Sequence, residues 1–495
     1  MKRYIIDKLT QSNFDDVFVK DALNGREYSY NTFFGRCLTL ASLIKDKAYG
    51  KNHLVLLMDN SIELMSCYFT SIILGRIATA IDPLKGEDEI MSIIDEIEDS
   101  FIIVDKVGGS KIAKADFVFS SSDFDKLSPM PDDVKQQITN IFEGIDFTKD
   151  YLLTFTSGTS GKTKGVRHSL NNLFSTAVAF NKEFGVDCEN TFAHVMPMTY
   201  MAGILNSIFQ PFVAGSSIVV LGRFSPMKAF TFWQDVEKYK VNTFWLSPSM
   251  LTILLKVAKH EVGQKYCKDH KTLFFIGTAP LHQSTRVEFE AKYPVKLYAS
   301  YGLSETLFLS TETPETLALG GGNVGKLLDG VSYRFDNDGE FLVDVPWMYL
   351  GYTNEPTENY FEDTSYKTGD LAKIENNILS IVGRKKDLII KGGMNLSPAL
   401  IEKVVSEIEG IDECAAFGAL NSQKEESVIL AYCLQNGYEG LKIEEIIHKS
   451  VLGVLGKNYM IDKFYNVSSI PKNINGKIDK NVLKAKWLEE NADKV

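Results

Sequence analysis

Apolar residues in the first hundred positions fall into short continuous runs, separated by longer segments with helical spacing. Residues 54–58 form one such run, and residues 77–81 and 101–104 form two more, as buried strands do. Between the first two runs, Asp59, Asn60 and Ser61 offer N-cap chemistry and Gly75 a stop, so a helix is predicted from this cap through Leu74. Strand, helix and strand at this spacing indicate parallel sheets covered by helices, and therefore an α/β fold.

The same patterns continue along the chain. Residues 28–45 predict a short strand and then an amphipathic helix, and the polar stretch 119–133 is expected to be an exposed loop. A helix is expected from about Ser169, and a later apolar helix is expected to end at Gly215. From Pro398 onward helices and strands alternate, which predicts a compact α+β unit. Further buried strands are expected at 151–155, 219–221, 243–246, 274–276 and 339–343.

Length and composition narrow the class of protein. A chain of 495 residues is too long for one core, so we expect at least two domains. The net charge of −11 argues against nonspecific nucleic-acid binding. No apolar stretch reaches the roughly 18 residues that span a bilayer, and the N-terminus lacks the pattern of a secretory signal. The six cysteines show no CxxC spacing, so we expect a cytoplasmic protein without a zinc site or a disulfide framework.

Residues 152–166 contain the strongest candidate for a ligand site. An apolar strand leads into a loop of glycines, hydroxyl residues and lysines, in which Thr156, Ser157 and Thr159 stand close to Lys162 and Lys164. Backbone N–H groups in such a loop form a concave anion site, and glycines let a polyphosphate approach closely. A Walker A loop would need glycine at position 156 and is excluded. Taken alone, the loop is equally consistent with an ordinary surface turn.

Three later segments are also unremarkable when each is taken alone. Residues 274–280 form a strand followed by a turn of small residues, residues 301–306 contain a tyrosine and a glutamate, and residues 366–371 contain Thr-Gly-Asp. Together with the later stretches 383–387, 391–402 and 471–478, and in this order and spacing, the four segments resemble the adenylate-forming superfamily of acyl-CoA synthetases, peptide-synthetase adenylation domains and luciferases. One departure is Thr163, where the family usually has proline. The resemblance covers residues from about 150 to 480.

The resemblance implies a binding site for ATP and Mg²⁺. It implies that Glu305 holds Mg²⁺, that Tyr301 stacks on adenine and that Asp370 accepts both ribose hydroxyls. Mg²⁺ commonly binds one or two carboxylates and completes its shell with water and phosphate oxygens, which suits this role. The remaining nucleotide residues implied by the resemblance are Thr156, Ser157, Gly158, Thr159, Lys164, Gly277, Thr278, Ala279, Pro280, Ser304 and Arg384.

The resemblance also implies two domains that move relative to each other. The large N-terminal domain would comprise residues 1–383 and the small mobile C-terminal domain residues 384–495, with Lys386 as the hinge. The second part carries equal numbers of acidic and basic residues, so the whole net charge falls on the first. Lys477, in the small domain, is implied to contact the reacting carboxylate and the α-phosphate. The expected fold is a multi-layer α/β domain followed by a small α+β domain.

The implied reaction has two steps. A carboxylate attacks the α-phosphorus of ATP to give acyl-AMP and pyrophosphate, and a thiol then displaces AMP. The thiol is that of CoA or, alternatively, of a carrier-protein phosphopantetheine acting in trans. A luciferase-like oxidative second step and an inactive nucleotide-binding regulatory protein are further alternatives. The presence of Lys164, Glu305, Asp370 and Lys477 argues against an inactive protein. The expected oligomeric state is a monomer or a homodimer.

The acid itself is indicated only by the residues that would line its pocket. By resemblance these are Tyr200, Met201, Gly203, Trp245, Ser249 and Gly302. Amino-acid-activating members have an aspartate just after the position of Tyr200, where this chain has Met201 and Ala202, and an unpaired buried ammonium would be costly. Acetate-using members have a tryptophan that fills the pocket at the position of Gly302, so here we expect the floor of the pocket to be open. We therefore expect a medium-to-long aliphatic acid or an aryl acid.

Overall fold

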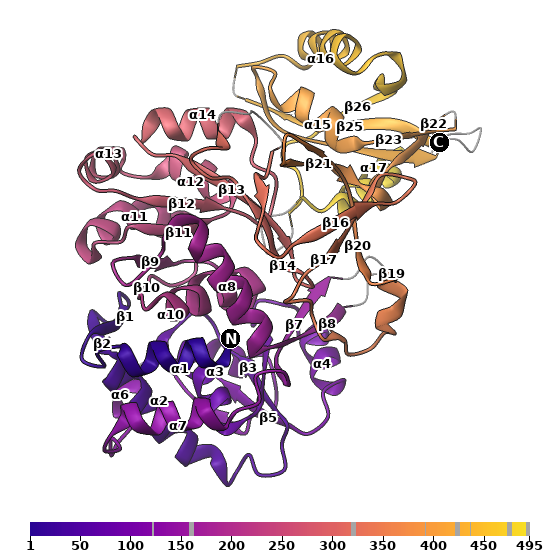
Figure 1. Cartoon of the computed structure of the whole chain (residues 1–495). Helices are drawn as coiled ribbons and strands as arrows, with labels where there is room; N and C mark the ends of the chain where they lie inside the picture. The colour runs from indigo at the N-terminus through magenta and orange to yellow at the C-terminus, as the bar shows by residue number, and fades with distance from the viewer. Residues whose placement is uncertain are drawn as a thin grey trace.

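Two large sheets form the framework of the N-terminal part (Figure 1). The computed structural model describes residues 1–120, 123–157, 163–317, 323–391, 393–420, 426–435, 437–472 and 478–491. The first sheet has seven strands in the order β18-β8-β7-β4-β3-β5-β6. Its strands are β3 (His53–Leu57), β4 (Ile77–Ile81), β5 (Ser100–Val104), β6 (Phe117–Val118), β7 (Asp150–Ser157), β8 (Thr163–Ser169) and β18 (Gly351–Tyr352).

The predicted strand–helix–strand unit lies at the centre of this sheet. Helix α3 (Ile62–Leu74) begins at Ser61, whose side chain accepts a hydrogen bond from the Leu64 N–H. It ends at Gly75, which has a φ of 62° and closes the helix in the left-handed conformation. Strands β3 and β4 are parallel, so the expected βαβ arrangement is confirmed.

The second sheet has nine strands in the order β15-β14-β13-β12-β11-β9-β10-β1-β2. Strands β9, β11, β12 and β13 are parallel neighbours. The strands are β1 (Val17–Asp21), β2 (Arg26–Ser29), β9 (Thr191–His194), β10 (Ser217–Val220), β11 (Thr243–Leu246), β12 (Leu273–Ile276), β13 (Leu297–Leu303), β14 (Leu307–Thr311) and β15 (Lys326–Leu327).

Helices cover both sheets, and the largest apolar core lies between them. It includes Leu56 of the first sheet, Phe275 of the second, and a cluster of phenylalanines around Phe69. A second core packs helices onto the other face of the nine-stranded sheet. The helices of this part are α1 (Lys2–Gln11), α2 (Tyr30–Lys45), α4 (Glu87–Asp95), α5 (Lys106–Gly109), α6 (Asp123–Lys126), α7 (Val134–Gly144), α8 (Leu170–Phe184), α9 (Met201–Ile204), α10 (Gln210–Ala214), α11 (Pro226–Tyr239), α12 (Pro248–Val257), α13 (His260–Asp269) and α14 (Gln283–Lys292).

Two details differ from the sequence-based expectation. The stretch 119–133 is not simply an exposed loop, because it contains α6 and buries Phe119 and Phe124 completely or almost so. The apolar helix that ends at Gly215 is interrupted, since a π-helical turn, η1 (Leu205–Phe209), separates α9 from α10. Apolar side chains at both places fill the core between the sheets, which polarity and periodicity alone did not indicate.

A third sheet and two small ones complete the chain. The third contains β16 (Ser332–Phe335), β17 (Glu340–Asp344), β19 (Phe361–Glu362), β20 (Ser365–Glu375) and β21 (Ile378–Arg384). Beyond it, the C-terminal segments form a separate body at the top of Figure 1, with two apolar cores drawn from residues 389–487. They are η4 (Lys385–Asp387), β22 (Ile389–Lys391), β23 (Met394–Leu396), α15 (Pro398–Ser406), β24 (Ile411–Leu420), β25 (Glu426–Leu434), α16 (Gly440–Leu455), η5 (Lys457–Tyr459), β26 (Lys463–Asn466) and α17 (Lys480–Glu490).

Helices and strands alternate in this last part, as the sequence predicted. The multi-layer α/β architecture followed by a smaller α+β part is therefore confirmed. Within the described residues, no helix has both the length and the apolar character needed to cross a bilayer.

Candidate active site

The predicted phosphate loop connects two antiparallel strands at one end of the seven-stranded sheet. Thr156 of β7 pairs with Lys164 of β8, and Ser157 pairs with Thr163. Gly158 and Thr159 lie outside the described residues. Lys164 is the second residue of β8, so the pairing places it at the base of the loop.

The Lys164 ammonium lies among aromatic rings and one carboxylate. Its Nζ is 2.8 Å from Oε2 of Glu355 and hydrogen-bonds the hydroxyl of Tyr360. The ring centroids of Tyr360 and Tyr352 lie 4.4 Å and 5.3 Å from the same atom. Burial acts to lower the pKa of Lys164, but the contacts with Glu355 and Tyr360 outweigh it and raise that pKa. The side chain therefore carries its positive charge at neutral pH.

Glu305 lies near Lys164 and shares a neighbour with it. The Tyr352 hydroxyl donates a hydrogen bond of 2.7 Å to Oε1 of Glu305, while the Tyr352 ring faces Lys164. The backbone carbonyl of Glu305 accepts from the Tyr349 N–H at 2.9 Å. Burial raises the pKa of Glu305, against the lowering effect of its hydrogen bonds and of nearby positive charge. A cation bound at this carboxylate would favour its ionised form.

The residues expected at adenine and ribose meet at a single carboxylate. The Tyr301 hydroxyl donates to Oδ2 of Asp370 at 2.6 Å, and Nε of Arg384 lies 2.9 Å from Oδ1. Asp370 and Arg384 face each other across the β20–β21 pair. The structure thus brings Tyr301 to a carboxylate 69 residues away in the sequence, next to Arg384.

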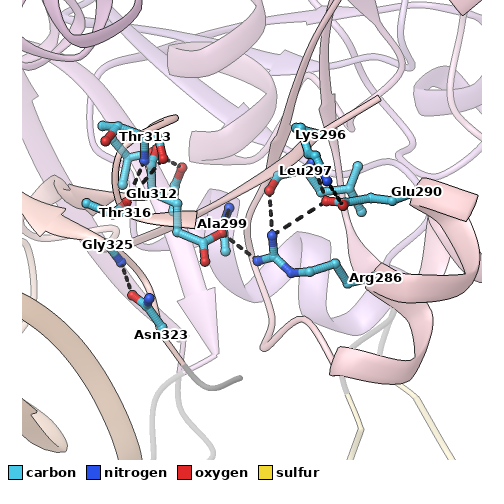
Figure 2. Close-up of polar contacts among 12 residues, drawn as sticks. Arg286, Glu290, Lys296, Leu297, Ala299, Glu312, Thr313, Thr316, Asn323 and Gly325 are labelled. Carbon is cyan, nitrogen blue, oxygen red and sulfur yellow. Dashed lines mark hydrogen bonds and ion pairs between the residues drawn. The ribbon is translucent and has the colours of Figure 1, made fainter. Parts of the chain in front are cut away.

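Strand β13, which carries Tyr301, is fixed by a buried polar network (Figure 2). Arg286 donates to the Leu297 carbonyl at 2.6 Å and also contacts the Glu312 carboxylate. The same Glu312 oxygen accepts from the Ala299 N–H at 2.7 Å. These bonds tie α14 and the residue after β14 to the first part of β13, and they fix the backbone that leads to Tyr301.

The parallel strands of the nine-stranded sheet end at a common edge. Strands β9, β11, β12 and β13 lie side by side, so the segments after their carboxyl ends gather there, as ligand-binding loops do in α/β folds. Thr278 has a φ of 71°, in the left-handed region. The His168 ring N–H donates to the Ser304 carbonyl at 2.6 Å, which ties β8 to this edge. The segments that reach the edge carry Tyr200, Met201, Gly203, Ser249, Gly277, Thr278, Ala279, Pro280 and Ser304.

Comparison with known proteins places the chain in a family. A family model described as AMP-binding enzyme matches residues 7–353. The chain belongs to this family. The 2-succinylbenzoate–CoA ligase of Listeria monocytogenes serotype 4b (strain F2365) is 29% identical over 350 residues, which cover 70% of this chain and 72% of that protein. The ligase of the same name from Staphylococcus aureus (strain JH9) is 24% identical over 507 residues, covering 96% and 98%.

Solved structures of similar proteins share the fold. ATP-bound MatB from Rhodopseudomonas palustris has a TM-score of 0.83 and 23% identity, covering 98% of this chain and 99% of that one. The o-succinylbenzoate CoA synthetase (MenE) from Bacillus subtilis, in complex with the acyl-adenylate intermediate OSB-AMP, has a TM-score of 0.80 and 20% identity, covering 97% and 98%. The comparisons confirm the resemblance to adenylate-forming enzymes, and the chain is an AMP-forming acid–thiol ligase.

Three members of the predicted acid pocket have clear packing roles. Trp245 is almost completely buried, donates to Oε1 of Gln210 at 2.8 Å and stacks on Phe308. A Cβ added to Gly302 would lie 2.0 Å from the Leu307 carbonyl oxygen, and one added to Gly203 would lie 1.9 Å from the Pro197 carbonyl oxygen. The two glycines therefore permit close backbone approach, and their contact with an acid stays a prediction.

The resemblance assigns two further residues, Lys386 and Lys477, to the C-terminal part. Lys477 lies outside the described residues. Lys386 lies in the short helix η4, and its neighbour Lys385 contacts the carboxylates of Asp336, Asp338 and Glu340 at 2.7, 2.9 and 3.2 Å. The role of Lys386 as a hinge stays a prediction.

The residues present suit a magnesium ion carried by a nucleotide. No group of three or more histidine, cysteine or acidic side chains that could hold a metal occurs in the part of the chain that the structure describes. Glu305 supplies a half-buried carboxylate, one oxygen of which accepts a hydrogen bond from Tyr352. Mg²⁺ commonly takes one or two protein carboxylates and fills its remaining positions with water and phosphate oxygens. Glu305 alone is thus a reasonable protein ligand for a nucleotide-bound Mg²⁺.

Sequence reasoning did not find the tyrosines and the acid that surround Lys164 and Glu305. Tyr352, Glu355 and Tyr360 belong to a segment with an unusual density of aromatic residues, which was a visible signal. Their partners lie far away in sequence, 196 residues in the case of Lys164 and Tyr360. Only the pairing of β18 with β8 reveals that they belong to the site.

Proposed function

We propose that this enzyme activates an aryl carboxylic acid as an acyl-adenylate and transfers the acyl group to CoA. The observation that carries the proposal is that one tyrosine, Tyr352, lies between a positive and a negative side chain. Tyr352 touches both the Lys164 ammonium and the Glu305 carboxylate. Such an arrangement suits a polyphosphate that needs a fixed positive group and a metal-binding carboxylate on the same side.

The chain's own residues do little covalent chemistry in this proposal. One acid oxygen bonds to the α-phosphorus of ATP, the bond to the bridging oxygen breaks, and pyrophosphate leaves. Lys164 lowers the cost of negative charge on the departing oxygens, and Asp370 with Tyr301 and Arg384 holds the ribose and adenine. Bound Mg²⁺ would neutralise phosphate charge. In the second step the thiolate sulfur bonds to the acyl carbon and AMP leaves. Preorganised charge and positioning supply the rate enhancement.

The choice of an aryl acid rests on two kinds of support. The relatives named above act, by name, on 2-succinylbenzoate, which is an aryl acid. The residues proposed to line the acid site include Tyr200 and Met201 and offer no charged group to an α-ammonium. An aryl ring buries a large apolar area, which favours it over acetate in such surroundings.

The test is ATP–pyrophosphate exchange over a panel of acids. The panel contains 2-succinylbenzoate, benzoate, aliphatic acids from acetate to dodecanoate, and amino acids. We expect the highest kcat/KM with an aryl acid and no exchange with amino acids. Loss of one preorganised contact typically costs roughly 100- to 1,000-fold in rate. The exchange rate of the Lys164→Ala variant should therefore be lower than that of the wild type by about that factor. Lys182→Ala, at an exposed ion pair with Asp329, is the matched control.

The second step is measured with the best acid, using CoA in one arm and a phosphopantetheine-loaded carrier protein in the other. We expect thioester with CoA. A preference for acetate or an amino acid would contradict the substrate class, and transfer only to the carrier protein would contradict the acceptor. Normal exchange by Lys164→Ala would contradict the role of this lysine.

A further inference from the structure

A clamp outside the recognised motifs holds the Lys164 ammonium. Glu355 lies 2.8 Å from its Nζ, and the Tyr360 hydroxyl accepts a hydrogen bond from it. The same hydroxyl donates to the Glu355 carboxylate, so three polar groups close a triangle. The Tyr360 ring also packs against the ammonium, with its centroid 4.4 Å away. We call Glu355 and Tyr360 the Lys164 clamp.

Backbone pairing brings the clamp to the phosphate loop. Strand β18 pairs with β8, and the Thr353 N–H donates to the Gly165 carbonyl at 3.0 Å, next to Lys164. Glu355 follows two residues later, and Tyr360 is the last residue of the helix η3 (Thr357–Tyr360). Both clamp residues lie beyond residue 353, where the match to the family model ends.

The clamp solves a problem that a lysine poses for polyphosphate binding. The lysine side chain is long and has many rotamers, and it loses entropy when a ligand fixes it. Glu355 and Tyr360 can occupy two of its three N–H donors, which aims the third. The Lys164 side chain is 11% exposed and that of Glu355 32%, so the pair is partly shielded from solvent. A lysine oriented before ATP binds needs less ordering when ATP arrives.

We propose that Glu355 and Tyr360 are positioning residues that orient Lys164 toward the polyphosphate of ATP in the adenylation step. The proposal rests on the role of Lys164 proposed above. It implies that the clamp affects only the step in which a triphosphate is present. Transfer of the acyl group from preformed acyl-AMP to CoA should not depend on it.

The variants Glu355→Gln and Tyr360→Phe test the clamp with minimal changes of shape. Each removes one partner of a partly shielded ammonium, so we expect kcat/KM for ATP in pyrophosphate exchange to fall by about fivefold. The rate of thioester formation from supplied acyl-AMP should equal that of the wild type. Glu362→Gln, which breaks an ion pair with Arg334 in the same segment, is the matched control and should leave both rates unchanged.

A double-mutant cycle with Lys164→Ala shows whether the clamp acts through the lysine. In the Lys164→Ala background, Glu355→Gln and Tyr360→Phe should cause no further loss. Additive losses, equal losses in both half-reactions, unchanged exchange, or a lower KM for ATP would each overturn the proposal. The last result would show that Glu355 competes with phosphate. If Lys164→Ala itself exchanges normally, the role of Lys164 fails first, and the two failures are thereby distinguished.

Discussion

Glu305 is a carboxylate in surroundings that disfavour its charge. Burial raises its pKa above the ordinary value, although Tyr352 donates a hydrogen bond to it. Such a group stabilises the folded protein below its unfolded pKa, and this contribution is lost as the pH rises through the higher folded pKa. Whenever Glu305 is ionised in the metal-free enzyme, its charge therefore carries a cost in stability. Functional sites often retain groups of this kind because a ligand needs them.

Glu305→Gln should therefore stabilise the enzyme in the absence of ATP and Mg²⁺. Glutamine is uncharged at every pH and can still accept the Tyr352 hydrogen bond. The Tm of the variant should exceed that of the wild type at pH 7 to 8, and the difference should shrink toward pH 4 as Glu305 becomes protonated. Thermal unfolding across this pH range is the measurement, with the exposed Glu362→Gln as control. A difference that does not change with pH would contradict the assignment.

Gly302 shows how one missing side chain can have two explanations. The sequence suggested an open floor of the acid pocket, whereas the structure shows the Leu307 carbonyl oxygen 2.0 Å from the position of a Cβ. Gly302→Ala should destabilise the protein by about 1–3 kcal/mol, as overpacking does. Gly144→Ala, at a position with no neighbour within 4 Å, is the control. Chemical denaturation measures the loss. Altered relative rates among acids, beyond a common decrease, would show that Gly302 also borders the substrate.

At the scale of elements, the two-residue strand β18 connects the phosphate loop with Glu305. It pairs with β8 and presents Tyr352 to Glu305 and Lys164. Groups that orient a metal ligand typically contribute 10- to 100-fold to metal affinity, so Tyr352→Phe should raise the Mg²⁺ concentration for half-maximal exchange by roughly tenfold. Tyr49→Phe is the control, because the Tyr49 side chain is exposed on the surface. Equal Mg²⁺ dependence in wild type and Tyr352→Phe would refute this role.

The elements that the sequence predicted well are those with local signals. Helix α3 has a serine cap and a glycine stop, so its end was predicted to the residue and its start to within the three candidate cap residues. Strands β4 and β11 were predicted equally well because each is a bounded apolar run. Strand β18 has only two residues and is defined by its hydrogen bonds to β8. No local sequence pattern predicts it.

The site shows the same division between local and distant information. The motifs indicated Lys164, Glu305, Tyr301, Asp370 and Arg384, and the last three do meet. Their supporting residues remained hidden, since a glutamate such as Glu312 or Glu355 is usually a solvated charge when only the sequence is known. What gives each of them a role is a contact made over a long sequence separation, such as that of Arg286 with Glu312 (Figure 2).

At the scale of the whole molecule, the third sheet ends at Arg384 and the C-terminal cores begin shortly after it. Its guanidinium contacts Asp370, and the next residue, Lys385, is held by three carboxylates of the third sheet. Beyond this point the apolar cores contain residues 389–487 only, as far as the structure describes them. Among the described residues, polar contacts between the two parts also join Lys256 with Asp412 at 3.3 Å, His282 with Ser406 at 3.2 Å, and Ser397 with the Val382 carbonyl at 2.7 Å. The boundary between residues 383 and 384 and the hinge at Lys386 stay predictions, and the contacts of Arg384 and Lys385 hold both of these residues to the third sheet.

Lys386→Pro should separate the two half-reactions. Proline fixes φ near −65° and disfavours a helical conformation of the residue before it, here Lys385 in η4. If the small part rotates about Lys386 between adenylation and thioester formation, the variant favours one arrangement and slows the step that needs the other. We expect a much larger loss in one rate, measured by pyrophosphate exchange and by acyl transfer from supplied acyl-AMP. Lys386→Ala is the control, because it removes the same side chain without fixing the backbone, and it should preserve both rates. Comparable rates for both steps in Lys386→Pro would place the hinge elsewhere.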